Sequence, residues 1–116
     1  MSVDVADRVF EAAADLFSLL AVPTRLRIVC ELCEGERNVS ELLDRIEVSQ
    51  PNISQHLGTL YRAGVVARRR AGSLVYYRLV SERARMLCDA VGTEQARAAA
   101  TKVPARSARS LQQPDS

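Results

Sequence analysis

The sequence of 116 residues contains no tryptophan, a single histidine and no long uninterrupted apolar run. A transmembrane helix needs about 20 consecutive apolar residues, so we expect no membrane partner. Asp4, Asp7, Arg8 and Glu11 place charges where a secretory signal would be apolar. We therefore expect a cytoplasmic protein, and its length predicts a single domain of modest size.

The sequence also lacks the motifs of the common enzyme classes. It has no glycine-rich phosphate loop, no HExxH pattern and no GxSxG elbow. His56 is the only histidine, which argues against a histidine-based metal site and against a Cys/His catalytic pair. We expect no enzymatic activity, no cofactor and no resident metal.

The sequence contains three cysteines, Cys30, Cys33 and Cys88. An odd number without a secretion signal argues against a disulfide framework, and it favours reduced thiols that either react or pack as small apolar groups. Cys30 and Cys33 have CxxC spacing, but they fall near the carboxyl end of a predicted helix. Thioredoxin-like chemistry needs such a pair at an amino end, so a thiol oxidoreductase is the weaker alternative.

Apolar residues at helical spacing predict three helices in the first part of the chain. The first spans about residues 3–20, and the second runs from Pro23 to Gly35 with apolar residues on more than one face, which predicts a central position. A short helix over residues 38–46 begins with a capping box formed by Asn38 and Glu41. The apolar face of the first helix consists of Val5, Val9, Phe10, Ala13, Phe17 and Leu20.

A fourth helix is predicted from Ser49, a capping residue, to Gly64, which favours a left-handed stop. Pro51 fits its first turn, where a missing N–H donor does no harm. Its buried face consists of Ile53, Leu57 and Leu60, and its polar face of Asn52, Gln55, His56, Thr59 and Arg62. Two helices joined by a short turn, the second with a polar face, are typical of a helix-turn-helix.

Residues 65–70 and 74–79 are rich in β-branched and aromatic side chains and predict a hairpin that turns at residues 71–73. Residues alternate sides along a strand, so Arg68, Arg69 and Arg70 cannot all serve one surface, and we expect Arg69 to pair within the protein. A last helix is predicted from Ser81 to about residue 100, followed by a disordered tail over 101–116.

The fold class predicted is mainly α with a β-hairpin wing, a winged helix-turn-helix domain over residues 1–100. Amide and guanidinium groups on an exposed helix can bind base edges in a major groove, and a basic hairpin can bind phosphates. The alternative of another class is a protein-interaction module whose arginines bind an acidic surface. The residues predicted to contact DNA are Ser49, Gln50, Asn52, Ser54, Gln55, His56, Thr59, Arg62, Arg68, Arg70 and Ser73. For His56 the sequence allows two roles, a contact with a DNA phosphate or a hydrogen bond between helices.

Three segments closely resemble the ArsR/SmtB family of winged-helix repressors. They are LAVPTRLRIV at 20–29, SQPNISQHLGTLYRAGVV at 49–66 and VYYRL at 75–79, and the resemblance covers roughly residues 5–95. It implies a homodimer joined by the first and last helices, which binds a palindromic double-stranded operator and releases it when an inducer binds.

The resemblance also bears on the inducer. Arsenic-sensing members carry an ELCVCDL motif where this sequence has ERNVSEL, and zinc-sensing members carry histidine on the last helix, which has none here. RIVCELCEGE at 27–36 is similar to the BigR/SqrR branch, which senses reactive sulfur through one cysteine on each of the second and last helices. This implies Cys30 paired with Cys88, although Cys88 lies about two turns earlier than the branch's second cysteine. Cys33 is an alternative partner, or a third thiolate for arsenite.

Overall fold

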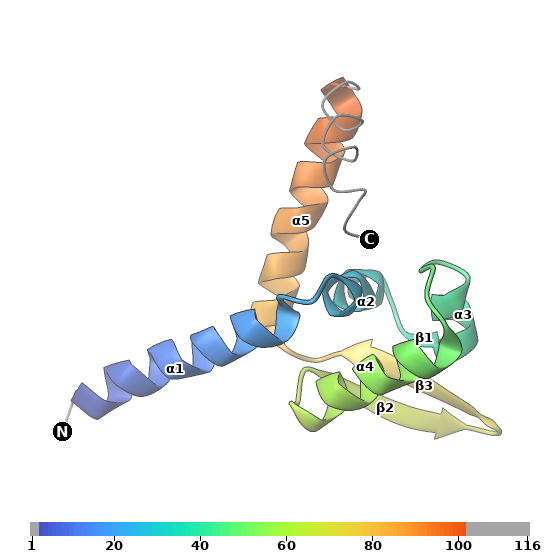
Figure 1. Cartoon of the computed structure of the whole chain (residues 1–116), viewed down its shortest axis with the longest axis horizontal. Coiled ribbons are helices and arrows are strands. Elements are labelled where there is room, and N and C mark those ends of the chain that lie inside the picture. Colours follow the sequence, from blue (N-terminus) through green and yellow to red (C-terminus); the bar gives the residue numbers. More distant parts are fainter. Residues whose placement is uncertain (1–2, 102–116) are drawn as a thin grey trace.

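The computed structural model describes the backbone of residues 3–101 and the side-chain surroundings of residues 4–92. Figure 1 shows a small body of helices and strands from which the first and last helices extend in different directions. In chain order the elements are α1 (Val3–Leu20), α2 (Pro23–Cys33), β1 (Arg37–Asn38), α3 (Val39–Leu43), α4 (Gln50–Arg62), β2 (Val66–Ala71), β3 (Leu74–Leu79) and α5 (Glu82–Thr101). This order confirms the winged helix-turn-helix prediction. The tail predicted beyond residue 101 lies outside the described residues.

The predicted helix caps are present. In α3, the Glu41 N–H donates to Asn38 Oδ1 at 2.8 Å, and the Asn38 N–H donates to Glu41 Oε1 at 2.9 Å, which completes the capping box. Ser49 Oγ accepts from the Asn52 N–H at 3.3 Å, and Ser81 Oγ accepts from the Ala84 N–H at 3.1 Å. One helix end differs from the prediction, because α3 ends at Leu43 and the chain continues to residue 46 in turns.

The sheet is antiparallel with strand order β1-β3-β2. The hairpin turn consists of Gly72 and Ser73 alone, because Ala71 pairs with Leu74 at the end of β2 and not, as predicted, in the turn. Gly72 has φ +67°, in the left-handed region that a tight hairpin turn demands. Strand β1 was not predicted, since two residues carry no alternation that a sequence pattern could reveal.

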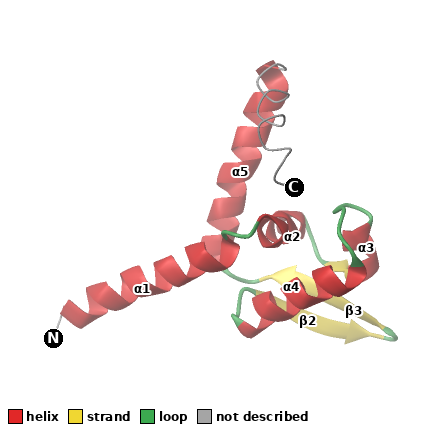
Figure 2. Cartoon of the chain, viewed as in Figure 1, coloured by secondary structure: helices red, strands yellow, loops and turns green. Residues whose placement is uncertain are grey.

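The core lies between α2, α3, α4 and the sheet. Its largest fully buried side chains are Ile28, Val29, Leu42, Ile53, Leu57 and Leu60. Helix α2 packs against α1, α4, α5 and β3, which confirms its predicted central position. Figure 2 shows α4 running across the hairpin, so the body of the molecule holds this helix and the wing next to each other.

The apolar face of α1 is largely exposed within this subunit. Val5, Val9, Phe10 and Phe17 are all exposed, and of the predicted apolar face only Leu20, at the carboxyl end, is buried. Figure 1 shows α1 and α5 diverging from the body at one corner. Within the described part of the chain, no helix is long and apolar enough to cross a membrane.

Candidate nucleic-acid interface and thiol cluster

Helix α4 presents a polar face to the outside. Its three aliphatic residues, Ile53, Leu57 and Leu60, are fully buried in the core, which fixes the rotation of the helix about its axis. The opposite face is exposed and carries amide, hydroxyl and guanidinium groups, from Gln50, Asn52, Ser54, Gln55 and Arg62. Such groups match the donors and acceptors of base edges in a major groove.

Three of the predicted DNA contacts on or next to α4 already have partners within the protein. The hydroxyl of Thr59, half-buried, donates to the Gln55 carbonyl oxygen at 3.2 Å. His56, also half-buried, accepts at Nδ1 from Arg25 Nε at 3.2 Å, a bond between helices. Ser49 is exposed, but its Oγ serves as the cap of α4.

Gly58 makes room for Arg62 on this face. A Cβ at Gly58 would lie 3.2 Å from Arg62 Nη1, so the guanidinium folds back along the helix over the glycine. Nothing in the sequence pattern singles out Gly58, because this close approach depends on the rotamer of a side chain one turn away.

Arg68 and Arg70 lie on the side of β2 that adjoins α4. Residues paired across an antiparallel sheet share a face. Arg68 pairs with Tyr77 and Arg70 with Val75, on the same face as the buried pair Val66 and Leu79. The Arg68 guanidinium carbon lies 3.9 Å from the ring centre of Tyr61 on α4. Two exposed arginines of the wing are thus placed beside the polar helix.

Arg69 lies on the other face of β2, as the alternation predicted. Its Nε and Nη2 donate to Glu36 Oε2 and Oε1, each at 2.9 Å, and its guanidinium carbon lies 5.0 Å from the ring centre of Tyr76. The hydrogen bonds from Arg69 lower the pKa of Glu36, and they raise the pKa of Arg69. The expectation that Arg69 pairs within the protein is confirmed.

Ser73 is the second residue of the hairpin turn and is exposed at the far end of the wing. Arg62, Arg68, Arg70 and Ser73 therefore all remain accessible to a large ligand. The described side chains place charge and hydrogen-bonding groups on the helix and on the wing next to it. This is the arrangement that positions a protein on a nucleic-acid backbone while a helix reads the bases.

The structure brings the three cysteines together. Cys30 and Cys33 are half-buried on α2, and Cys88 is buried on α5, where its Sγ donates to the Val29 carbonyl oxygen at 3.8 Å. The Cys88 side chain also interacts with those of Cys30 and Cys33. The position of Cys88, two turns earlier than in the sulfur-sensing branch, therefore does not separate it from Cys30.

Burial sets the protonation of this cluster. Desolvation raises the pKa of Cys88 well above its ordinary value, and the neighbouring Cys33 and Cys30 side chains raise it further. Burial also raises the pKa of Cys30, but the neighbouring Cys88 side chain acts in the opposite direction. Because the thiolate is the reactive form, Cys30 is better placed than Cys88 to make the first attack on an electrophile.

The cluster does not form a ready metal site. Among the residues that the structure describes, no group of three or more His, Cys, Asp or Glu side chains could hold a metal ion. A three-thiolate arsenite site would thus require the three side chains to rearrange and to lose their protons.

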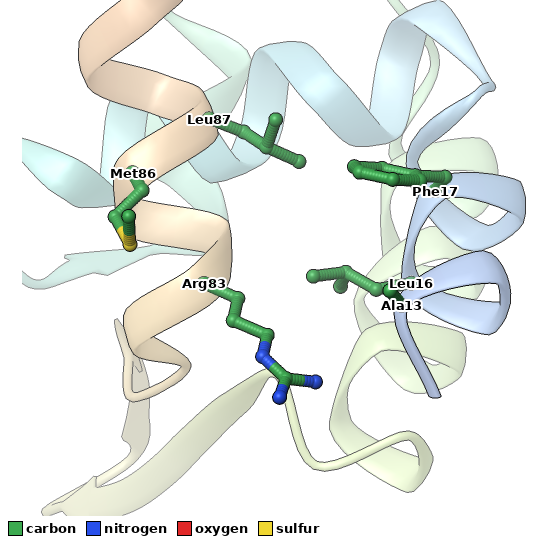
Figure 3. Close-up of a pocket in the computed structure, with 6 residues that line it drawn as sticks. All are labelled: Ala13, Leu16, Phe17, Arg83, Met86 and Leu87. Atoms are coloured by element: carbon green, nitrogen blue, oxygen red, sulfur yellow. The ribbon is translucent and has the colours of Figure 1, made fainter. Parts of the chain in front are cut away.

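A cavity of about 230 Å³ lies between the carboxyl-terminal half of α1 and the first turns of α5. Figure 3 shows side chains from both helices around it, with the Arg83 guanidinium as its polar group. It is lined by Ala13, Leu16, Phe17, Arg83, Met86 and Leu87. Phe17 and Met86 are exposed, so this apolar surface is open to a second molecule.

Comparison with known proteins places this geometry in a family. A family model described as "Bacterial regulatory protein, arsR family" matches residues 22–68, from α2 into β2. The transcriptional repressor SmtB of Mycobacterium tuberculosis is 45% identical over 84 residues, which is 72% of this chain and 62% of that protein. The match thus spans less than two thirds of that relative's length.

Two further comparisons are with Xylella fastidiosa, one by sequence and one by structure. A biofilm growth-associated repressor is 42% identical over 80 residues, covering 69% of this chain and 70% of that protein. The crystal structure of the transcriptional repressor BigR superimposes with a TM-score of 0.70 at 40% identity, covering 80% of this chain and 94% of that one. The relatives are transcriptional regulators and not enzymes, and they confirm the family resemblance found in the sequence. The chain belongs to the arsR family of bacterial regulatory proteins.

Proposed function

We propose that this protein is a homodimeric, DNA-binding transcriptional repressor that a thiol-based signal releases from its operator. The observation that carries the proposal is the joint exposure of the polar face of α4 and of Arg68 and Arg70 on the adjoining side of the wing. Polar groups on a surface helix alone would be ordinary. Their position beside a basic hairpin favours a nucleic acid as the ligand.

In the proposed complex, α4 lies in the major groove. Asn52 and Gln55 can each form two hydrogen bonds with an adenine, and Arg62 can do so with a guanine. Arg68, Arg70 and Ser73 contact the phosphates of the flanking backbone, and the Gln50 N–H at the amino terminus of α4 adds one donor, since Ser49 Oγ already accepts from the Asn52 N–H. Arg69 makes no DNA contact, because Glu36 occupies its guanidinium.

The proposed dimer uses α1 and α5. Phe10 is 74% exposed and Met86 is 64% exposed, and the cavity beside Phe17 is open to a second apolar surface. Covering such side chains with a second copy removes apolar area from water, which is the main driving force of association. A two-fold dimer presents two copies of α4 to successive major grooves, which predicts a palindromic operator with half-sites about 34 Å apart.

The proposed signal is an oxidant of the sulfane-sulfur class, such as an inorganic polysulfide. The Cys30 thiolate attacks the terminal sulfur of hydrogen disulfide, breaks its S–S bond and releases hydrogen sulfide, which leaves a persulfide on Cys30. Cys88 or Cys33 then loses its proton, and its thiolate attacks Cys30 Sγ and expels hydrosulfide, which takes up that proton to give a second hydrogen sulfide. Two thiols and one hydrogen disulfide thus yield one disulfide and two hydrogen sulfides, with atoms and electrons balanced.

A Cys30–Cys88 bond would join α2 to α5. Because α2 lies against α4 and α5 belongs to the proposed dimer contact, the bond would favour a dimer whose two reading helices no longer match successive grooves. A Cys30–Cys33 bond would instead distort the last turn of α2. Either change needs to favour the released state by only a few kcal/mol.

The DNA-binding part is tested by selecting duplexes from a random pool with the reduced protein. The proposal predicts an enriched inverted repeat, bound with an affinity that falls linearly with salt on a log–log plot. An unenriched pool, or an affinity that does not depend on salt, would refute DNA recognition and would favour the protein-interaction alternative.

The thiol switch is tested on the selected duplex. Polysulfide should release the wild-type protein and not the Cys30→Ser protein, and mass spectrometry of the released protein should show which cysteine is joined to Cys30. Release of the duplex is also measured in parallel samples with peroxide and with arsenite, which distinguishes a sulfane-sulfur signal from a general oxidant and from a metalloid. Release by arsenite alone would replace the sulfur signal with a metalloid, and release of Cys30→Ser by all three would refute a switch at Cys30.

A further inference from the structure

The Arg25 side chain joins three helices, α1, α2 and α4, which is the proposed reading helix. Arg25, half-buried in the first turns of α2, donates from Nε to His56 Nδ1 at 3.2 Å and from Nη1 to the Leu19 carbonyl oxygen at 3.0 Å. Leu19 lies in the last turn of α1, where carbonyl groups lack partners within their own helix. His56 lies in the middle of α4.

We propose that Arg25 is a positioning residue that fixes the reading helix relative to α1 through a neutral His56 imidazole, so that acid weakens operator binding. This inference rests on the proposed function, because α4 is taken to read DNA and α1 to join the two subunits. The angle between these two helices then decides whether both copies of α4 fit one operator. Arg25 is bonded to both helices at once and takes part in no ion pair within the described part of the chain.

The link depends on the protonation of His56. A neutral imidazole offers the Nδ1 lone pair to the Arg25 N–H, whereas an imidazolium carries a proton on Nδ1 and repels the guanidinium. Helix α4 packs against α2, α3 and β2, and Arg25 is the charged side chain of these elements that acts on His56. Arg68 of β2 lies over Tyr61 instead. Burial, and then Arg25, lower the pKa of His56, so the imidazole is neutral at pH 7.

The sign of the pH effect distinguishes this role from a phosphate contact. If His56 bound a phosphate, protonation would add a positive charge and operator affinity would rise as the pH falls. If His56 holds α4 in place through Arg25, protonation breaks the link and affinity falls. The lone histidine of the sequence makes the effect attributable to one group.

The first experiment measures the affinity of the reduced protein for its selected duplex at pH 7.5 and pH 5.5. We expect the wild-type affinity to fall, by less than the roughly tenfold loss that an imidazole of ordinary pKa would give at pH 5.5, because burial and Arg25 lower the pKa of His56. His56→Asn keeps an acceptor near the place of Nδ1 and cannot titrate. It should show no such fall, with an affinity at pH 7.5 between those of wild type and His56→Leu. A wild-type affinity that is constant or rises on acidification would overturn the inference.

The second experiment needs no DNA. The single imidazole is titrated by NMR in the wild type, in Arg25→Met and, as the matched control, in Arg27→Met, whose guanidinium bonds to the Arg45 carbonyl oxygen and pairs with Glu31. Arg25→Met should raise the pKa of His56, and Arg27→Met should leave it unchanged. If the pKa of His56 were the same in the wild type and in Arg25→Met, the proposed coupling between Arg25 and His56 would be overturned. A protein that binds no duplex at any pH, yet shows this shift, would refute the proposed function and leave the contact itself established.

Discussion

The reading unit, formed by α3, α4 and the β2–β3 hairpin, and the helical pair, formed by α1 and α5, use their apolar residues in opposite ways. In the reading unit, Ile53, Leu57 and Leu60 are fully buried, and the polar face of α4 is left outside. In the helical pair, Phe10 and Met86 are mostly exposed. The apolar face of the reading unit is thus covered within one chain, whereas no surface among the described residues covers Phe10 and Met86 of the helical pair.

The difference shows what an amphipathic pattern can and cannot tell. Helical spacing of apolar residues predicts both α1 and α4, because it reports only that one face avoids water. It does not say whether the cover comes from the same chain or from another. Substituting an apolar residue in each part therefore tests the difference. A substitution in the reading unit should change the unfolding free energy, and one in the helical pair should change dimerisation.

The largest expected effect is on the folding of the reading unit. Leu57→Ala removes a fully buried side chain from the core, and such a change costs about 2–5 kcal/mol of unfolding free energy. Urea unfolding at several protein concentrations measures it, and the loss should be the same at each. A loss under about 1 kcal/mol would mean that α4 is not held by this core.

The next effect concerns the helical pair. Phe10→Glu places a charge on the exposed apolar face of α1 and should weaken dimerisation by more than about tenfold, because the charge must be buried without a partner. Sedimentation velocity over a dilution series measures the change, with Asp15→Ala on the same helix as the control. If Phe10→Glu dimerises like the wild type, α1 does not form the contact.

A smaller effect separates the two faces of the wing. Arg68→Ala and Arg70→Ala should each reduce the log–log salt slope of operator binding by about 1, the change expected when one phosphate contact is lost. Arg69→Ala is the matched control from the same strand and should leave the slope as it is, because Glu36 already binds its guanidinium. Equal salt slopes for the three variants would contradict the assignment of Arg68 and Arg70 to the DNA-binding face of the wing and of Arg69 to the opposite face.

The smallest effect lies at the ion pair between Glu36 and Arg69. Because Arg69 lowers the folded-state pKa of Glu36, the pair stabilises the protein above the unfolded-state pKa. That contribution is lost as the pH falls through the folded-state value. The melting temperature of Glu36→Gln should therefore be slightly below that of wild type at neutral pH, with the gap closing in acid. If the difference in melting temperature widened in acid, the ion pair would not be the source of the stability difference.

Local signals in the sequence predicted most of the reading unit. Ser49 and Asn38 cap the helices they were expected to cap, Gly64 has φ +79° in the predicted left-handed stop, and strand alternation placed Arg69 apart from its neighbours. Each of these depends on residues within one turn or one strand. Short-range chemistry of this kind is visible in a sequence because the partners are adjacent in it.

Contacts between distant residues could not be predicted in this way. Arg25 and His56 are 31 residues apart, and Cys88 and Val29 are 59 apart, so their meeting depends on how whole helices pack. The family resemblance implied a pair of cysteines, but only the packing of α5 on α2 shows that Cys88 approaches both Cys30 and Cys33. Strand β1 forms because β3 is already present to pair with it.

The most direct test of the exposed reading face compares duplexes selected by wild-type protein and by Gln55→Ala. If the Gln55 amide reads a base, the variant should enrich the same inverted repeat but lose the preference at one position in each half-site, at a cost of about 1–3 kcal/mol for that base. If single substitutions at Gln55, Asn52 and Arg62 each leave every preference intact, helix α4 does not read the operator.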